Sequence, residues 1–151
     1  MKKLLFYAAA LLAAISFQAC SDDDENGLPA TPENIAGTWQ IVQEKGWEID
    51  WDEKDTFLEN YPDKDGWYYT FTFDKDGSFT VTEIWGKEDG GDTSTENGSY
   101  SISGKELRLN IRGYNQRHIE IRKLTKSQLV LFVIMDYDLQ SEYTATFKRI
   151  E

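Results

Sequence analysis

Hydrophobic and polar residues alternate along most of the chain after Thr38, with the period of two expected of β-strands that have one buried face. The longest alternating stretch, residues 38–51, contains Gly46, which marks a bulge or a bend. The pattern predicts a single strand here, with the following residues on one shared face: Trp39, Ile41, Gln43, Lys45, Trp47, Ile49 and Trp51.

More alternating stretches follow, separated mainly by short turns that contain Gly, Asp or Ser. The sequence therefore predicts eight strands: 38–51, 67–73, 78–85, 98–102, 106–112, 118–124, 129–135 and 143–150. Short strands at even spacing, with no long helix between them, indicate an antiparallel meander. Such a meander is either closed into a barrel or folded as a sandwich.

Two connections are longer than turns. Residues 52–66 are rich in acids, and within them Thr56–Tyr61 is predicted to form a helical turn capped by Asp55 and ended by Pro62. Loops of this length often cover binding sites, so we expect a lid here. Residues 86–97 are polar and are predicted to form a loop without core residues.

Composition and charge narrow the functional classes. Aromatic residues make up 14% of the 151 residues, enough to fill a small core or to line an apolar pocket. The formal net charge is −11, and removing residues 1–19, which carry Lys2 and Lys3 and no acid, leaves −11 − 2 = −13. A field of this sign repels nucleic acid, so we expect no nucleic-acid partner. It can attract cations or basic partners, although its simplest role is solubility.

Residues 1–19 have the composition of a secretory signal peptide, because two basic residues precede an apolar run too short to span a bilayer comfortably. The end of this segment, Ala19 before Cys20, resembles a bacterial lipobox. The resemblance implies cleavage before Cys20 and lipidation of that residue, which would anchor the protein to the outer membrane. The alternative is a plain signal peptide, cleaved nearby, that leaves Cys20 as a free thiol.

An acidic run, Ser21-Asp22-Asp23-Asp24-Glu25, follows Cys20 and resembles the surface-export signal of Bacteroidota lipoproteins. The resemblance implies a domain exposed at the cell surface. Alternatively, the acids only solvate a flexible tether. A segment containing glycine and prolines comes next, so we expect residues 20–34 to form a lipidated acidic tether.

No reaction chemistry is recognisable in the sequence. His118 is the only histidine and is expected at the surface, because one histidine cannot build a zinc site of the usual kind. No nucleophile–base arrangement and no phosphate-binding glycine loop is recognisable. The Asp-Lys-Asp-Gly segments at 63–66 and 74–77 lack the glutamate of a calcium loop, so turns are expected there. We therefore predict that the protein is not an enzyme and uses no metal or cofactor.

One acid lies on a predicted inward face. Glu83 has the same strand parity as Phe79, Val81 and Trp85. Burial of a carboxylate is costly unless the group is paired or faces a ligand. Glu83 therefore either contacts a ligand or stays in water near a barrel mouth.

Several segments in order resemble the lipocalin-like domains of bacterial lipoproteins. Gly37-Thr38-Trp39 is similar to the G-x-W signature of lipocalins, and the stretch from Tyr69 to Phe79 resembles the second hairpin of these domains. Further similar segments follow in the expected order: Gly98–Ile102, Leu107, Leu109, Leu124-Thr125, Leu129–Leu131 and Phe147–Arg149. The resemblance implies that residues 35–151 form an eight-stranded antiparallel up-and-down barrel.

The resemblance also implies roles for particular residues. In lipocalins the signature tryptophan closes one end of the barrel beneath a basic residue of the last strand, which here gives Gly37, Trp39 and Arg149, with Lys148 as the other candidate. The family further implies binding of a small apolar or amphipathic molecule. The expected wall is Trp39, Ile41, Trp67, Tyr69, Phe71, Phe79, Val81 and Trp85, with Glu83 as a polar contact. If these residues instead fill the barrel, the protein is an interaction module that contacts a protein or a glycan at the cell surface.

Overall fold

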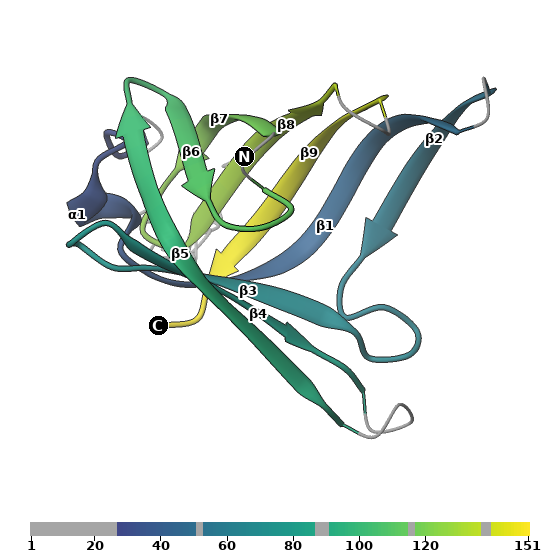
Figure 1. Cartoon of the computed structure of the whole chain (residues 1–151), viewed down its shortest axis with the longest axis horizontal. Helices are drawn as coiled ribbons and strands as arrows, with labels where there is room; N and C mark the ends of the chain where they lie inside the picture. Colours follow the sequence, from purple (N-terminus) through teal and green to yellow (C-terminus); the bar gives the residue numbers. More distant parts are fainter. Residues whose placement is uncertain (1–26, 51–52, 87–90, 115–116, 137–139) are drawn as a thin grey trace, which may run out of the picture.

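The computed structural model describes residues 27–50, 53–86, 91–114, 117–136 and 140–151. The predictions for the leader, for Cys20, for the acidic run after it and for Trp51 lie outside these ranges. The described residues form one short helix and nine strands (Figure 1). Their bounds are α1 Pro32–Ile35, β1 Gly37–Asp50, β2 Glu53–Asn60, β3 Tyr68–Phe73, β4 Ser78–Ile84, β5 Thr93–Ser103, β6 Glu106–Asn110, β7 Arg117–Leu124, β8 Gln128–Met135 and β9 Gln140–Arg149.

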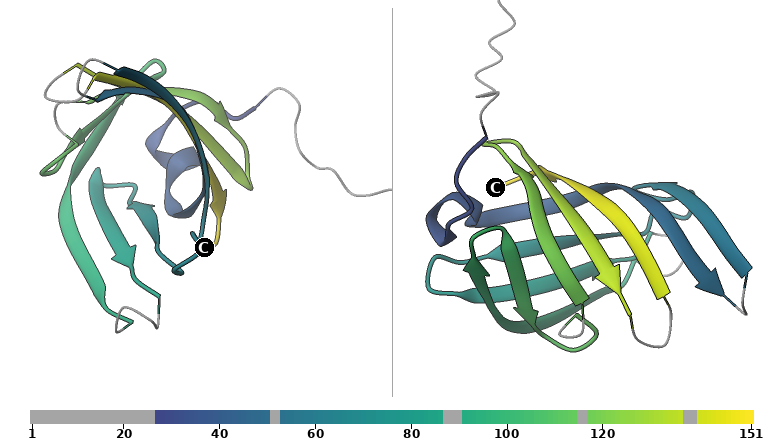
Figure 2. Two further views of the ribbon diagram at one scale, coloured as in Figure 1. Left: turned by 90° about the vertical axis from the view of Figure 1, so that its right-hand side faces the viewer. Right: turned by 90° about the horizontal axis from the view of Figure 1, so that it is seen from above.

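The strands form one antiparallel sheet that closes on itself. Their order is β2-β1-β3-β4-β5-β6-β7-β8-β9, and β1 also pairs with β9, from Trp39 opposite Arg149 to Ile49 opposite Gln140. The predicted eight-stranded antiparallel up-and-down barrel is therefore confirmed, and the sandwich is excluded. β2 is an additional strand outside the ring, and it pairs with the second half of β1 (Figure 2).

The segment that precedes β1 covers one end of the barrel. Thr31 caps α1 by accepting a hydrogen bond from the backbone N–H of Asn34, and Pro32 occupies the first turn, where its missing N–H is not needed. Ile35 is fully buried, and its carbonyl accepts a hydrogen bond of 2.7 Å from the indole N–H of Trp39. α1 consequently lies across this end, where it is visible through the ring in the left view of Figure 2.

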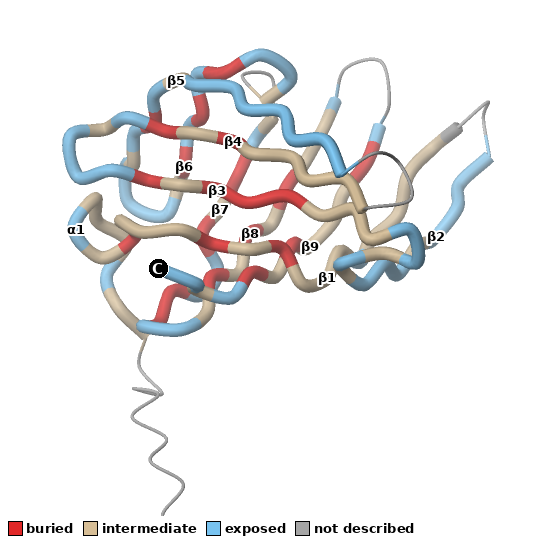
Figure 3. Tube along the Cα trace, turned by 90° about the horizontal axis from the view of Figure 1, so that it is seen from below, coloured by how far each residue is buried: buried red, intermediate tan, exposed pale blue. Residues whose placement is uncertain are grey.

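The half of the barrel next to α1 is solid. Phe71 stacks on Phe147 with 4.9 Å between ring centres, and the rings of Phe73 and Phe79 lie 4.8 Å apart. Buried positions gather in this half, whereas β2 is almost entirely exposed (Figure 3). Each large apolar side chain buried here contributes roughly 1.5–3 kcal/mol, so this half stabilises the fold.

The helical turn predicted for Thr56–Tyr61 is wrong, because residues 53–60 form β2. This strand pairs with the second half of β1 in regular register, from Gln43 opposite Asn60 to Asp50 opposite Glu53. β3 pairs only with the first residues of β1, so the rest of that side of β1 would otherwise present unpaired backbone groups. Pairing with β1 thus overrides the local turn preference, and most of the expected lid is a strand.

The inward face predicted for β1 holds only for its first half. The register with β9 shifts between Ile41 and Gln43, so Val42 is the extra residue of a β-bulge, which the prediction placed at Gly46. A shift of one residue turns every later side chain to the opposite face. The inward residues of the second half are therefore Glu44 and Glu48, in place of the predicted Gln43, Lys45, Trp47 and Ile49.

Two boundaries also differ from the prediction. β5 begins at Thr93, so the polar loop is shorter than residues 86–97, because the exposed first residues of β5 pair with β4. The backbone N–H of Leu28 donates a hydrogen bond of 2.6 Å to Leu124, and the Leu28 side chain packs against the core. The folded part therefore overlaps the expected tether of residues 20–34.

Candidate ligand-binding site

The end of the barrel opposite α1 is hollow. A cavity of about 390 Å³, here called the mouth cavity, opens between the far ends of the strands. Four acids line it: Glu44, Glu48, Glu59 and Glu83. The other lining residues are Phe57, Trp67, Tyr69, Tyr114, Arg117, Met135, Ser141 and Tyr143. Its lining is thus aromatic and acidic rather than aliphatic.

Two tyrosines fix the carboxylate of Glu44. The Tyr69 hydroxyl donates to one carboxylate oxygen at 2.7 Å, and the Tyr61 hydroxyl is 2.8 Å from the other. Tyr69 belongs to β3 and Tyr61 follows β2, so the carboxylate bridges the place where β1 separates from β3. Hydrogen bonds to an ionised acceptor are among the stronger ones, so we expect these contacts to orient Glu44 firmly.

Tyr61 lies between two carboxylates. Its hydroxyl oxygen is 2.6 Å from Oε2 of Glu59 as well as within hydrogen-bond distance of Glu44. A phenol carries one proton and can donate to only one of the two acceptors at a time. At any moment one of these carboxylates therefore lacks this donor.

Burial changes the acidity of the tyrosines around the mouth cavity. Burial and the hydrogen-bonded carboxylates raise the pKa of Tyr61 above its ordinary value of 10.0. Burial likewise raises the pKa of Tyr69 and of Tyr114, and it raises the pKa of Tyr143 to about 12. All four phenols consequently remain protonated at neutral pH.

Arg117 is the cationic residue of the lining, and the chain itself holds it. Its Nε donates to the carbonyl of Gly113 at 3.0 Å, and Nη1 donates to the hydroxyl of Tyr143 at 2.9 Å. The guanidinium also lies 4.1 Å from the centre of the Tyr114 ring, which packs in a T-shaped contact with Phe71. Tyr114 thus points inward and separates the mouth cavity from the solid half.

A tight turn places Trp67 on the cavity wall. Oδ1 of Asp63 accepts hydrogen bonds from the backbone N–H groups of Asp65 at 2.9 Å and of Trp67 at 2.8 Å. Gly66 completes the turn with a φ of 84°, a conformation that glycine adopts without strain. The Asp-Lys-Asp-Gly segment at 63–66 therefore forms a turn, as predicted.

The predicted wall residues separate into two groups. Three of them line the mouth cavity: Trp67, Tyr69 and Glu83. Five of them are buried in the core: Trp39, Ile41, Phe71, Phe79 and Val81. Trp85 is half-buried just beyond β4 and is not among the lining residues. Ligand contact stays a prediction for all of them, and the geometry favours the first group.

The predicted contact between the first and last strands is present at the closed end. The guanidinium of Arg149 lies 4.2 Å from the centre of the Trp39 ring, and the two residues are directly paired. Arg149 also donates hydrogen bonds to the carbonyls of Ala36 and Asn34. Gly37 has a φ of 133°, and a Cβ at this position would lie 2.5 Å from the guanidinium. Glycine is therefore the residue that fits here.

Most of the mouth lining has no clear signal in the sequence. Glu44 and Glu48 have the parity of outward residues, and only the bulge at Val42 turns them inward. Phe57 and Glu59 belong to the segment predicted to be helical. The remaining unpredicted residues lie at strand ends or outside the alternating stretches: Tyr114, Arg117, Met135, Ser141 and Tyr143.

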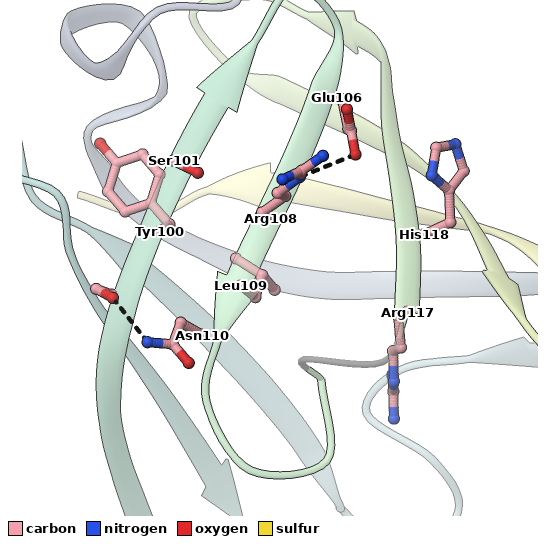
Figure 4. A pocket seen from close by; sticks show the side chains of 9 residues that line it. Tyr100, Ser101, Glu106, Arg108, Leu109, Asn110, Arg117 and His118 are labelled. Carbon is pink, nitrogen blue, oxygen red and sulfur yellow. Dashed lines mark hydrogen bonds and ion pairs between the residues drawn. The ribbon is translucent and has the colours of Figure 1, made fainter. Parts of the chain in front are cut away.

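A second hollow lies on the outer surface where β6 and β7 diverge (Figure 4). This outer groove has a volume of about 690 Å³, and the two strands that border it pair at two positions. Within it Arg108 is paired with Glu106 at 3.0 Å, and His118 is exposed, as predicted. Five of its nine lining residues are exposed, so a small molecule there would remain largely in water. The mouth cavity is therefore the better candidate site.

Two features are absent from the ranges that the structure describes. No three acidic, histidine or cysteine side chains gather closely enough there to hold a metal ion. No helix in those ranges has the length and apolar character needed to span a bilayer.

A closed antiparallel barrel, sealed by a short helix at one end and hollow at the other, is a cup-shaped barrel of the lipocalin type. The model of the family described as lipocalin-like domain matches residues 35–131, which is more than half of the chain, so the chain belongs to this family.

Comparison with solved structures agrees with this fold. The chain is similar to a lipocalin-like protein from Bacteroides uniformis, with 20% identity, a TM-score of 0.54, and coverage of 78% of this chain and 99% of that one. The bovine lipocalin allergen Bos d 2 shares 19% identity over 78% of this chain and 73% of its own. Its TM-score of 0.46 is too low to support an inference. No curated protein matches the sequence.

Proposed function

We propose that this chain is a surface-anchored lipoprotein whose lipocalin-like barrel binds a small amphipathic molecule in the mouth cavity, without catalysing a reaction. The mouth cavity carries the proposal, because it is a hollow of about 390 Å³ in a barrel whose other half is solid. Sites for small molecules commonly have volumes of about 300–1,000 Å³. Membership of the lipocalin-like family is consistent with such a role.

The lining favours an amphipathic ligand over a wholly apolar one. Trp67 and Tyr69 offer aromatic surface, with 5.8 Å between their ring centres. Glu44 and Glu83 place carboxylates in the same space. A hydrocarbon without a polar group would leave these carboxylates partly desolvated, and this is costly.

The alternative function, a solid interaction module, requires a barrel that side chains fill throughout. Phe71, Phe79 and Phe147 fill the half next to α1 and fit that description. The cavity beyond Tyr114 does not fit it. We therefore favour capture of a small molecule over recognition of a protein or a glycan by the outer surface.

The anchor is proposed from the sequence, through the signal peptide of residues 1–19 and the lipobox-like segment before Cys20. Leu28, the start of the packed chain, pairs with Leu124 close to α1. The tether would therefore leave the barrel at its closed end. The mouth cavity would then face away from the outer membrane, open to molecules outside the cell.

Tryptophan fluorescence of the purified protein tests ligand capture. Trp67 lines the mouth cavity, whereas Trp85 does not. We expect amphipathic aromatic probes to change the emission of the parent protein and of Trp85→Phe, and to have little effect on Trp67→Phe. If all three proteins ignore the probes, and native mass spectrometry of protein made in its host finds no bound molecule, the proposal is wrong.

Fractionation of cells tests the anchor separately. We expect Cys20→Ala to move the protein from the membrane fraction to the soluble fraction. Replacement of the acids from Asp22 to Glu25 by alanine should reduce protease access to the domain on intact cells. Unchanged access would remove surface export from the proposal and leave ligand capture standing.

A further inference from the structure

We infer that the ligand of the mouth cavity is a small organic cation, an ammonium group attached to an apolar or aromatic body. This inference rests on the proposed function, because it names the class of molecule that the same cavity takes. It is carried by the charge of the lining, the aromatic walls, and the spacing of the carboxylates.

The lining of the mouth cavity is strongly anionic. Four glutamates and one arginine give it a formal charge of −4 + 1 = −3. None of these glutamates takes part in the ion pairs of the described residues, which join Lys64 to Asp65, Arg108 to Glu106 and Arg122 to Glu120. Carboxylates that converge in a half-enclosed space repel one another, and a bound cation relieves that repulsion.

Arg117 does not take the place of such a cation. Its Nε and Nη1 donate to Gly113 and Tyr143, and its guanidinium face covers Tyr114. These contacts commit the group to Gly113, Tyr114 and β9, where it forms part of the wall. The glutamates on the opposite strands are left for a ligand.

Glu44 and Glu59 show where an ammonium group would be received. Both carboxylates lie within hydrogen-bond distance of the single hydroxyl of Tyr61, at 2.8 and 2.6 Å. Since that hydroxyl has one proton, one carboxylate oxygen remains without this donor. An ammonium group carries several N–H donors and a positive charge. It can therefore donate to this oxygen and also offset the negative charge of the lining.

Aromatic rings flank the acids on two sides. Tyr61 and Trp67 pack edge to face with 5.5 Å between ring centres, and the ring centres of Phe57 and Tyr143 lie 6.1 Å apart on the other wall. Those two rings meet across Gly46, which pairs with Phe57 on one side and Tyr143 on the other. Ring faces attract organic cations and also accept an apolar body.

The spacing of the acids favours an organic cation over a metal ion. Calcium and magnesium require several oxygen atoms within about 2.0–2.6 Å of the ion. No group of three acids, histidines or cysteines in the described ranges meets this requirement. The four glutamates are instead distributed around a space of about 390 Å³, which matches an extended molecule.

Three probes with one body and different head groups test the inference. 4-Phenylbutylamine, 4-phenylbutanol and 4-phenylbutanoate share an aromatic body and carry a cationic, a neutral and an anionic head. Isothermal titration calorimetry of each against the purified protein measures the affinities. We expect the amine to bind at least about tenfold more tightly than the alcohol, and the carboxylate to bind more weakly than the alcohol. Added salt should weaken binding of the amine and leave that of the alcohol nearly unchanged.

Variants that each remove one negative charge test whether the preference for the amine arises in the mouth cavity. Glu44→Gln and Glu83→Gln keep the shape of the lining and remove one negative charge each. We expect both to reduce the preference for the amine over the alcohol, while retained binding of the alcohol shows that the barrel is folded. Glu142→Gln is the matched control, because Glu142 lies on β9 between Ser141 and Tyr143 but does not line the cavity. It should keep the full preference.

The outcomes separate the inference from the proposed function. Equal binding of all three probes, or tighter binding of the alcohol or the carboxylate, would overturn the cationic ligand and leave capture of a small molecule intact. Full preference for the amine in both cavity variants would also overturn the inference. Binding of none of the probes would count against ligand capture itself and would remove the inference with it.

Discussion

Trp39 joins three parts of the chain at the closed end of the barrel. Its ring is fully buried, its indole N–H donates to the carbonyl of Ile35, and the guanidinium of Arg149 covers one face. These contacts connect the segment before β1, β1 itself and the end of β9. A single side chain thus couples closure of the ring to closure of its end.

Replacement of Trp39 by alanine should lower the free energy of unfolding by about 3–5 kcal/mol, because it leaves a large cavity and removes both polar contacts. Trp47→Ala is the control on the same strand, since Trp47 is half-buried beneath Lys54. We expect a much smaller loss for this variant. Urea unfolding followed by circular dichroism measures both, and equal losses would contradict the role assigned to Trp39.

The hairpin of β1 and β2, together with its packing against β9, determines which side chains line the mouth cavity. The bulge at Val42 turns Glu44 and Glu48 inward. Gly46 then permits a close approach, since a Cβ there would lie 2.5 Å from the Cβ of Tyr143 and 2.2 Å from a backbone oxygen of β9. The extra residue Val42 and the absence of a side chain at Gly46 together determine the shape of the open end.

Gly46→Ala should therefore force β1 and β9 apart and lower the free energy of unfolding by about 1–3 kcal/mol. Lys45→Ala, at an exposed neighbouring position, should change it by no more than about 0.5 kcal/mol. Thermal or urea unfolding measures the difference. A stability of Gly46→Ala equal to that of the control would show that the two strands do not meet as described.

The same elements show how far the sequence determines the structure in advance. Alternation identifies the eight barrel strands, and the G-x-W segment with Arg149 identifies the closed end, because these depend on local pattern and on a family signature. The bulge at Val42 leaves no trace in composition. β2 forms because β1 extends beyond the residues that pair with β3. This depends on pairing between distant segments, which local sequence patterns do not reveal. The mouth cavity depends on both, so Glu44, Glu48 and Glu59 could not be predicted from the sequence, whereas the parity of Glu83 places it there in advance.

At the scale of the whole molecule, the barrel combines a solid end with an end lined by acids and phenols. Burial raises the pKa of Tyr69 and Tyr143, the latter to about 12, above the ordinary 10.0. The unfolded chain therefore loses these protons at lower pH than the folded protein does. Stability from these groups is complete below about pH 10 and is lost as the pH rises toward the folded values.

The free energy of unfolding should consequently fall as the pH is raised from about 9 to 11.5, and Tyr143→Phe should make this fall less steep. Urea titrations across that range, with phenolate absorbance recorded in parallel, provide the measurement. A free energy of unfolding that stays constant or rises over the range would contradict the buried, protonated phenols.

The central claim is that a small amphipathic molecule enters the mouth cavity, and amide NMR of the isotope-labelled protein tests it most directly. During titration with 4-phenylbutylamine we predict shifts concentrated around Glu44, Trp67, Tyr69 and Glu83, with little change near Phe73 and Phe79 in the solid half. Shifts confined to the outer groove around Ser101 and His118, or no shifts at all, would contradict the claim.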